Sequence, residues 1–312
     1  MTRTRVPASP RDPKTILVVR LSALGDVVHT IPAVVALRDA LGAEISWAVE
    51  RPYAELVEIV TGVRAIRASM RKWGRSLFSS RNDIRIFIRN LRGHDIAVDF
   101  QGLIKSALVA RMSGAPARFG FDRDAIREKP AAMLLNRHAG VDQTRHVVEW
   151  NMQLASVVAG RELAMPRADF SKFAKGSGCG RRIVVLPGAG KANKIWPPER
   201  YGELMRRIGE TAVAVWGPNE RELAERTGLE LAPPTTLREL AAILRDARLV
   251  IGGDTGPLHL AAALGTPVVG LYGPTSLRRN GPYGQLDRCV TASSMETMTV
   301  DEVAQTVKIN LV

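Results

Sequence analysis

Short apolar runs alternate with amphipathic segments along the chain. Near the start, a run of apolar and β-branched residues at 16–19 predicts a buried strand, and a second run at 45–49 predicts another. The segment between them carries apolar residues at helical spacing, namely Val28, Ile31, Val35 and Leu41. Strand, helix and strand in this order are typical of a βαβ unit, in which the strands are parallel. Further predicted elements of this half are a strand at 96–100 and helices at 104–112 and 145–158.

The pattern restarts after residues 171–180, a small, basic and glycine-rich segment that is typical of a linker. Pro197 and Pro198 open a helix, and Thr236 with Glu239 forms a capping box before another. Other predicted elements of this half are strands at 183–186, 212–216, 249–251 and 268–272, and a helix at 258–264.

Both halves therefore predict an α/β fold of the doubly wound, Rossmann-like kind. We place one domain at 1–170 and a second at 181–312. Such folds bind ligands at the carboxyl ends of their strands, so we expect the two domains to face each other across a ligand-binding cleft.

Composition narrows the possible functions. The 312 residues are 46% hydrophobic and 24% charged, which is typical of a folded protein of enzyme size. No apolar run approaches the roughly 20 residues that span a bilayer, and no secretory leader is evident, so we expect a cytoplasmic protein. Two cysteines, Cys179 and Cys289, are too few for a disulfide framework and have no metal-ligand spacing.

Charge points to an anionic partner. Lys and Arg number 44 against 31 Asp and Glu, a net charge of +13 that attracts nucleic acid, an anionic membrane or phosphorylated substrates. Aromatic residues make up only 5% and do not alternate with arginines as in proteins that stack single-stranded bases. Nucleic-acid binding is therefore the weaker hypothesis.

Two loops of the second half have the composition of a nucleotide-diphosphate site. The run 252–259 brings Gly252 and Gly253, then Asp254, Thr255, Gly256, Pro257 and His259, to the point where a strand gives way to a helix. Glycines let backbone N–H groups approach a phosphate, and the helix N-terminus attracts negative charge. The alternative is an ordinary helix cap. The loop 187–197 adds Lys191 and Lys194 without forming a Walker sequence, and their alternative is simple solvation.

Single carboxylates follow two other predicted strands. Glu220 could accept hydrogen bonds from ribose hydroxyls, or it could lie in a first helical turn as acidic residues often do. Asp26 follows the first strand, where it could take a proton from a hydroxyl nucleophile or cap the helix. His29, one turn further on, is more simply a structural histidine. Asp122 and Asp124 form a DxD that we discount as a metal site, because no clear strand precedes it.

An arginine-rich segment occupies residues 64–92. Arg71, Lys72 and Arg75 belong to it. It is either a solvated helical face or a surface that binds an anionic acceptor or membrane.

Five segments in this order resemble the ADP-heptose:lipopolysaccharide heptosyltransferases, a GT-B glycosyltransferase family. They are SALGDVVHTIP (22–32), DFQGLIKSAL (99–108), PGAGKANKIWP (187–197), WGPNE (216–220) and GGDTGPLHLAAALGTPVVGLYGPT (252–275). The DVVHTIP and QGLIKSAL runs are most similar to the first-acting enzymes, which add heptose to Kdo of the inner core. Those enzymes commonly carry threonines where this chain has Ala189 and Gly190, and second-acting members share a PGA-type loop.

The resemblance implies an inverting transfer of heptose from ADP-heptose to Kdo-lipid A, with no metal and no cofactor. Asp26 would be the general base and Lys194 the cation on the pyrophosphate. The donor site would also include Ala189, Gly190, Glu220, Asp254, Thr255, Gly256, Pro257 and His259. Gln101 and Lys105 would lie near the sugars, and Arg71, Lys72 and Arg75 would bind the acceptor.

The acceptor implies peripheral contact with the cytoplasmic face of the inner membrane and no nucleic-acid partner. In the family the helix after Val300 packs back on the first domain, and we expect the same here. A second-acting enzyme and a GT-B-like sugar-nucleotide epimerase remain as alternatives.

Overall fold

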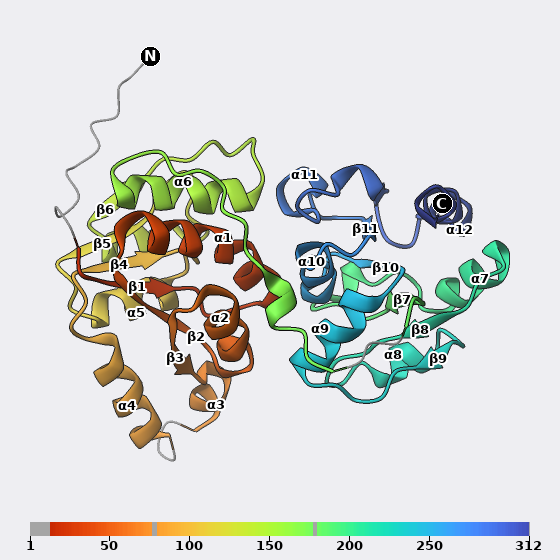
Figure 1. Cartoon of the computed structure of the whole chain (residues 1–312), viewed down its shortest axis with the longest axis horizontal. Coiled ribbons are helices and arrows are strands. Elements are labelled where there is room, and N and C mark those ends of the chain that lie inside the picture. Colours follow the sequence, from red (N-terminus) through yellow and green to blue (C-terminus); the bar gives the residue numbers. More distant parts are fainter. Residues whose placement is uncertain (1–12, 77–79, 177–179, 312) are drawn as a thin grey trace. The chain divides into compact units, whose positions relative to one another are not determined.

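The computed structural model describes residues 13–76, 80–176 and 180–311, and Cys179 lies outside this part. The chain divides into two compact units, Met1–Ala168 and Asp169–Val312, and each is described by itself (Figure 1). No helix of the described part is long and apolar enough to span a membrane.

The first unit is built on a parallel sheet of six strands. Its order is β3 (Arg64–Ala68), β2 (Glu44–Glu50), β1 (Thr15–Val19), β4 (Ile96–Asp99), β5 (Ala117–Phe121) and β6 (Arg137–Ala139). Val19 at the end of β1 pairs with Ala48 on one side and Asp99 on the other. Residues 16–19 are buried because helices cover both faces of the sheet, which explains their unbroken apolar run.

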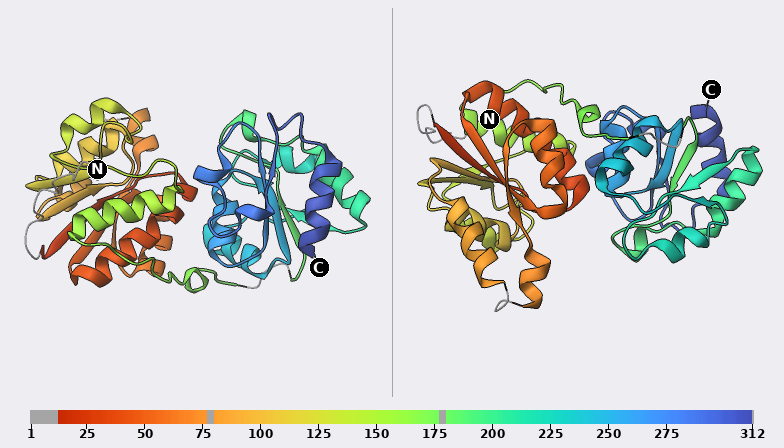
Figure 2. Two further views of the ribbon diagram at one scale, coloured as in Figure 1. Left: turned by 90° about the horizontal axis from the view of Figure 1, so that it is seen from above. Right: turned by 60° about the horizontal axis from the view of Figure 1, so that its bottom comes forward.

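The helices of this unit are α1 (Leu24–Leu41), η1 (Arg51–Tyr53), α2 (Ala54–Thr61), α3 (Met70–Arg75), α4 (Arg81–Leu91), α5 (Ile104–Met112), η2 (Lys129–Leu134) and α6 (Val147–Ala159). Helices α1 and α6 pack together on one face, and α5 lies on the other (Figures 1 and 2). Gly42 ends α1 with φ of 60°, a conformation that favours glycine.

The second unit repeats this topology. Its order is β9 (Glu230–Leu231), β8 (Ala212–Ala214), β7 (Ile183–Leu186), β10 (Leu249–Gly253), β11 (Val268–Tyr272) and β12 (Val290–Thr291), all parallel. In both units the chain starts at a central strand, builds outward to one edge and then returns to the other side of that strand. The carboxyl ends of β1 and β4, and those of β7 and β10, are therefore equivalent positions.

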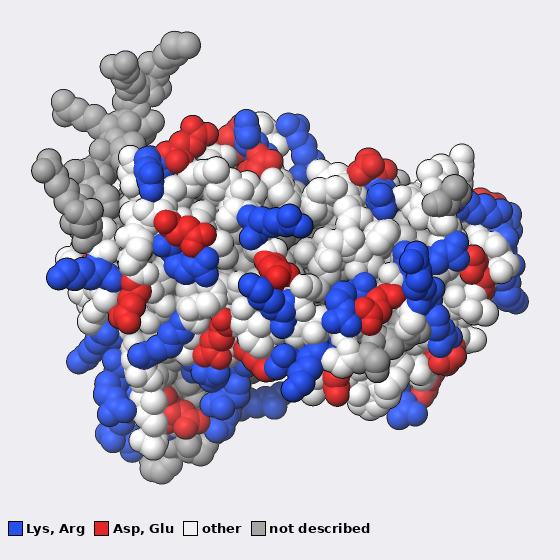
Figure 3. Space-filling model, in the orientation of Figure 1, with Lys and Arg blue, Asp and Glu red and all other residues white. Residues whose placement is uncertain are grey.

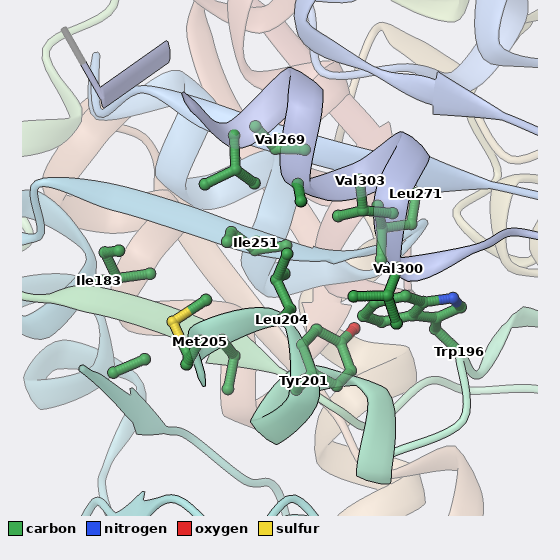
Figure 4. Close-up of a cluster of buried hydrophobic side chains, with 14 of the residues drawn as sticks. Ile183, Trp196, Tyr201, Leu204, Met205, Ile251, Val269, Leu271, Val300 and Val303 are labelled. Atoms are coloured by element: carbon green, nitrogen blue, oxygen red, sulfur yellow. The ribbon is translucent and has the colours of Figure 1, made fainter. Parts of the chain in front are cut away.

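The helices of the second unit are η3 (Phe170–Lys172), η4 (Ala192–Lys194), α7 (Glu199–Ile208), α8 (Arg221–Glu225), α9 (Leu237–Asp246), α10 (Gly256–Ala263), α11 (Leu277–Asn280), η5 (Leu286–Arg288) and α12 (Val300–Leu311). Trp196 and Tyr201 meet edge to face at 4.9 Å in the apolar core beneath α7 (Figure 4). Val300 and Val303 bring α12 into the same core, where it packs on α7. The expected packing of this last helix on the first domain stays a prediction.

The predicted elements correspond to observed ones with small shifts at their ends. The capping box is confirmed, since Thr236 Oγ1 accepts from Glu239 N at 3.3 Å and Glu239 Oε2 accepts from Thr236 N at 2.7 Å. The helix predicted from residue 145 begins at Val147 instead, because His146 is its N-cap and accepts from Val148 N through Nδ1. Short edge strands such as β6, β9 and β12 have too few residues to produce an alternating pattern.

Candidate active site

Two clusters of charged side chains lie at the equivalent positions of the two sheets. The Arg20 cluster consists of Arg20, Asp26, Asp99 and Gln101, at the carboxyl ends of β1 and β4. The Lys194 cluster consists of Lys194, Asp254 and His259, at the carboxyl ends of β7 and β10. Each is where the strand order reverses, which is where doubly wound sheets bind ligands.

In the Lys194 cluster a buried carboxylate holds two cationic or polar side chains. Lys194 Nζ donates to Asp254 Oδ2 at 2.5 Å, and His259 Nε2 lies 3.0 Å from Asp254 Oδ1. The Asp254 side chain is only 9% exposed and that of His259 5%, whereas Lys194 is 22% exposed. The lysine is therefore the member of the cluster that solvent or a ligand reaches.

The neighbours of Asp254 keep it ionised. Burial raises the pKa of this carboxyl, but the hydrogen bonds and charges of His259 and Lys194 together outweigh burial, so its pKa lies below the ordinary value. Asp254 is therefore a fixed negative charge behind the lysine at neutral pH.

Close packing of glycines brings the two loops together. A Cβ on Gly253 would lie 2.6 Å from the carbonyl oxygen of Lys194, and one on Gly252 would lie 2.7 Å from the Leu186 Cβ. Any side chain at Gly253 would push the lysine loop away from the end of β10. The pair of glycines that the sequence singled out is thus required for this approach.

The N-terminus of α10 adjoins Asp254. Thr255 is its N-cap, and Gly256 and Pro257 begin the helix. Thr255 is 9% exposed, and its hydroxyl oxygen is buried with no hydrogen-bond partner among the described residues. The N-terminal N–H groups and this hydroxyl give the end of the helix several donors for an anion.

Glu220 lies over the ends of β7 and β8. Its Oε2 accepts from Gly217 N at 2.8 Å, and a Cβ on Gly188 would lie 2.3 Å from its Cδ. Gly188 therefore leaves the space that this carboxylate fills. In the same loop Ala189 is half-buried and Gly190 is exposed.

In the Arg20 cluster the cation is buried and the carboxylate is the more exposed partner. Arg20 NH2 lies 2.6 Å from Asp26 Oδ1, with side-chain exposures of 5% and 32% respectively. The N-cap of α1 is Ala23, and Asp26 Oδ2 is 3.4 Å from Ala23 N. Asp26 thus lies in the first turn of the helix, and its Oδ2 has only a long hydrogen bond.

Asp99 organises the loop after β4. Its Oδ1 accepts from the backbone N–H groups of Gln101 and Gly102 at 2.9 and 3.2 Å, and its Oδ2 accepts from Ser106 Oγ at 2.9 Å. Burial raises the pKa of Asp99 to about 6, although these hydrogen bonds and the charge of Arg20 act in the opposite direction.

The predicted acceptor residues differ in their surroundings. Gln101 is 3% exposed and uses its Oε1 to accept from Leu21 N at 2.9 Å, so it anchors the loop before Asp26. Lys105 is exposed on α5. Lys72 and Arg75 are exposed on α3, where Lys72 Nζ lies 3.0 Å from Asp83 Oδ2. The side chain of Arg71 lies outside the described part.

Lys and Arg gather around α3 and α4 at the lower end of the first unit (Figure 3). Asp83 is the only acidic residue of these two helices. The segment therefore presents a strongly basic surface.

A family model for glycosyltransferase family 9 (heptosyltransferase) matches residues 84–309. The chain belongs to this family. Lipopolysaccharide heptosyltransferase 1 of Pseudomonas aeruginosa is 35% identical over 289 residues, which are 86% of this chain and 81% of that protein. The protein of the same name from Salmonella typhimurium is 30% identical, over 86% of this chain and 92% of its own length.

Among solved structures, E. coli heptosyltransferase WaaC with ADP matches with a TM-score of 0.83 at 28% identity, covering 95% of this chain and 99% of that one. This family 9 glycosyltransferase therefore has the GT-B fold that its sequence predicts.

Two residues of this glycosyltransferase escaped the sequence analysis. Arg20 directly follows the predicted strand at 16–19 and was not singled out, and Asp99 appeared only as the first residue of the segment 99–108. Both are charged residues placed directly at the end of a buried parallel strand, and that position is the signal that could have found them.

The expectation about Asp122 was also wrong in one respect. Strand β5 ends at Phe121, so a strand does precede the DxD. Asp122 Oδ1 accepts from the backbone N–H groups of Asp124 and Ala125, at 3.2 and 3.0 Å, which closes a turn.

Proposed function

We propose that this glycosyltransferase transfers heptose from ADP-heptose to Kdo-lipid A, with inversion at the anomeric carbon and without a metal ion. The names of its relatives support the sugar and the lipopolysaccharide acceptor. The structure of WaaC with ADP supports ADP as the nucleotide.

The observation that carries the donor assignment is the Lys194 cluster. A partly exposed ammonium is fixed by a buried, ionised carboxylate beside a helix N-terminus with an unused hydroxyl donor. When the anomeric C–O bond breaks, negative charge grows on the departing diphosphate. A preorganised cation and helix N-terminus stabilise that charge where it develops.

On the acceptor side, Asp26 is the proposed general base. The acceptor hydroxyl oxygen forms a new bond to the anomeric carbon and gives its proton to the carboxylate, and ADP leaves with the electrons of the broken bond. The partial exposure of Asp26 at the end of the first sheet supports this role. Glu220 is the proposed contact to the ribose.

The lipid acceptor places this reaction at the cytoplasmic face of the inner membrane. The basic surface around α3 and α4 supports contact with the phosphorylated, Kdo-bearing acceptor or with the anionic membrane that contains it.

The test is to incubate the protein with ADP-heptose and Kdo-lipid A, to follow ADP release and to weigh the lipid product. We expect ADP release that depends on the acceptor and a product heavier by one heptose. Transfer only to an acceptor that already carries one heptose would identify a second-acting enzyme. Conversion of ADP-heptose without any acceptor would identify an epimerase instead.

A further inference from the structure

A buried arginine stands directly behind the carboxylate proposed as the base. Arg20 is 4% exposed. One guanidinium nitrogen, NH2, contacts Asp26 Oδ1 at 2.6 Å, and the other, NH1, donates to the carbonyl oxygen of Phe100. The guanidinium therefore joins the start of α1 to the end of β4.

The backbone of Arg20 is held as firmly as its side chain. Its N–H donates to Ala48 O at 3.3 Å, and its carbonyl oxygen accepts from Trp47 Nε1 at 3.1 Å. Leu21, the next residue, donates to Gln101 Oε1, and Gln101 is in turn fixed by Asp99. Arg20 is thus supported by β2 and β4, and Asp26 inherits this rigidity through the guanidinium.

The two oxygens of Asp26 have different surroundings. Oδ1 is held by Arg20 at 2.6 Å, whereas Oδ2 has only long approaches, from Ala23 N at 3.4 Å and Arg127 NH1 at 3.9 Å. A carboxylate held through one oxygen by a charge-assisted bond presents the other oxygen in a fixed direction.

We propose that Arg20 is a positioning residue that fixes Asp26 through Oδ1, so that Oδ2 is the atom that takes the proton of the acceptor hydroxyl. This inference rests on the proposed function, in which Asp26 is the base. Arg20 itself touches no substrate and exchanges no proton, since its guanidinium stays charged throughout.

Asp99 keeps a negative charge near Arg20 after the proton has been transferred to Asp26. When Asp26 accepts a proton, its negative charge disappears and the buried guanidinium loses its direct counter-ion. The Asp99 carboxyl is close enough for the charge of Arg20 to act on it. It therefore supplies a second negative charge on the buried side of the cluster.

The first test is Arg20→Met, which keeps the length of the side chain and removes its donors. We expect kcat to fall about 10- to 100-fold, because a misplaced reacting group costs about this much. KM for each substrate should stay within about threefold, because neither substrate contacts Arg20. Arg20→Lys keeps the charge but offers a single donor group for two acceptors, so it should restore part of kcat.

The decisive test combines these variants with Asp26→Asn. If Arg20 acts through Asp26, adding Arg20→Met or Arg20→Lys to Asp26→Asn leaves kcat at the value of Asp26→Asn alone. A further loss of 10-fold or more in the double variants would overturn the inference, because Arg20 would then support the fold or the substrates independently of Asp26.

Arg38 offers a matched control at the other end of α1. It also contacts a carbonyl oxygen, that of Thr61, and a carboxylate, that of Asp39 at 2.6 Å. Arg38→Met should leave kcat unchanged and should lower the melting temperature less than Arg20→Met does, because the Arg38 side chain is 40% exposed. An equal loss of kcat in Arg38→Met would assign the Arg20 effect to the stability of α1.

The outcomes separate this inference from the function on which it rests. If no heptose is transferred by the wild-type protein, the proposed function fails. If heptose is transferred but Asp26→Asn keeps turnover within a few-fold of wild type, the assignment of the base fails. Only when Asp26→Asn is strongly impaired and the double variants lose more does the role of Arg20 fail by itself.

Discussion

The two units repeat one strand order, yet they place opposite charges in reach of a ligand. At the end of β1, Arg20 is buried and its partner Asp26 is 32% exposed. At the end of β7, the relation is reversed, since Asp254 is 9% exposed and its partner Lys194 is 22% exposed. Each site is an ion pair of similar composition in which one member supports the other.

This reversal matches the chemistry that each unit is proposed to perform. A hydroxyl that loses a proton needs a carboxylate, and a departing diphosphate needs a cation. The buried partner fixes the exposed one and balances its charge. If these proposed roles are right, the same topology serves both through the choice of which ion is buried.

The units also differ in the helices that connect the third strand of each sheet to the fourth. Between β3 and β4 the chain forms α3 and α4, whereas between β9 and β10 it forms only α9. The additional helices of the first unit carry the basic segment. This difference favours an acceptor role for the first unit, because an anionic lipid needs such a surface and a nucleotide does not.

The largest expected effect comes from the exposed carboxylate of the first unit. Asp26→Asn keeps the shape of the side chain and removes the base, so kcat should fall about 10²- to 10⁴-fold. ADP affinity should be unchanged. Asparagine is nearly isosteric with aspartate, so a purely structural Asp26 would leave both turnover and melting temperature near wild type. Measurement of kcat and melting temperature on this variant separates the two roles.

Sequence patterns predicted most of the architecture because buried parallel strands and amphipathic helices have distinct periods. The helix at 104–112 and the strand at 183–186 were placed with the observed ends. The resemblance also selected Lys194, Asp254 and His259, which the structure brings into direct contact.

The burial of ions could not be predicted in the same way. The buried side chain of Arg20 donates from NH1 to the carbonyl oxygen of Phe100, which lies far along the chain. Gln101 illustrates the same limit, since no sequence pattern predicts that its side chain is buried and accepts a hydrogen bond from Leu21 N. Long-range pairs of this kind leave no periodic signal in a single sequence.

The next largest effect concerns the pH dependence of stability, in which the buried carboxyl groups of the two units, Asp99 and Asp254, differ. Asp254 is paired directly with two neighbours and its pKa is lowered, whereas burial raises the pKa of Asp99 to about 6. A folded-state pKa above the ordinary value of 3.8 means that the stabilising contribution of Asp99 is fully present below pH 3.8. It is lost as the pH rises toward about 6.

Asp99→Asn should therefore gain stability relative to wild type across this pH range. An asparagine keeps the acceptor for the backbone N–H groups and has no charge to bury. The advantage should grow by about 2.5 kcal/mol between pH 4 and pH 7, or about 5–10 °C in melting temperature. Calorimetric scans of both proteins at several pH values measure it.

Asp95 is the control, because its substitution should change stability with pH in the opposite direction. Backbone hydrogen bonds from Thr15 and Lys14 lower its pKa, so its contribution is present above pH 3.8 and is lost in more acidic solution. Asp95→Asn should lose stability relative to wild type as the pH rises. If the difference in stability between Asp99→Asn and wild type did not change with pH, burial of the ionised Asp99 carboxyl would not destabilise the fold.

The exposed cation of the second unit should give a smaller effect. Lys194→Ala removes a charge-assisted phosphate contact worth about 1.5–3 kcal/mol, so ADP should bind about 10- to 100-fold more weakly by calorimetry. Lys308→Ala, on α12, removes an exposed positive charge from the same unit and should leave ADP affinity nearly unchanged. Unchanged affinity in Lys194→Ala would make that lysine a solvated side chain.

The smallest effect should come from the basic segment that only the first unit carries. Replacing Arg71, Lys72 and Arg75 together by alanine removes three charges worth about 0.5 kcal/mol each, so KM for Kdo-lipid A should rise about 10-fold at low salt. KM for ADP-heptose should stay within about twofold. The exposed ion pair of Lys72 and Asp83 contributes little to the stability of the fold, so the melting temperature should not change.

The matched control is a triple variant in the second unit, with alanine in place of Arg206, Arg207 and Lys308. It changes the net charge by the same amount and should leave both KM values unchanged. If both triples raised KM for the lipid to the same extent, the net charge of +13 would be responsible rather than a surface of the first unit. If the first triple raised KM for both substrates equally, the segment would serve the donor, and the division of roles between the two units would be wrong. A selective rise that disappears in high salt is the result that ties the basic segment to an anionic acceptor, because screening weakens exposed charges at a distance and leaves the buried pairs of the two clusters intact.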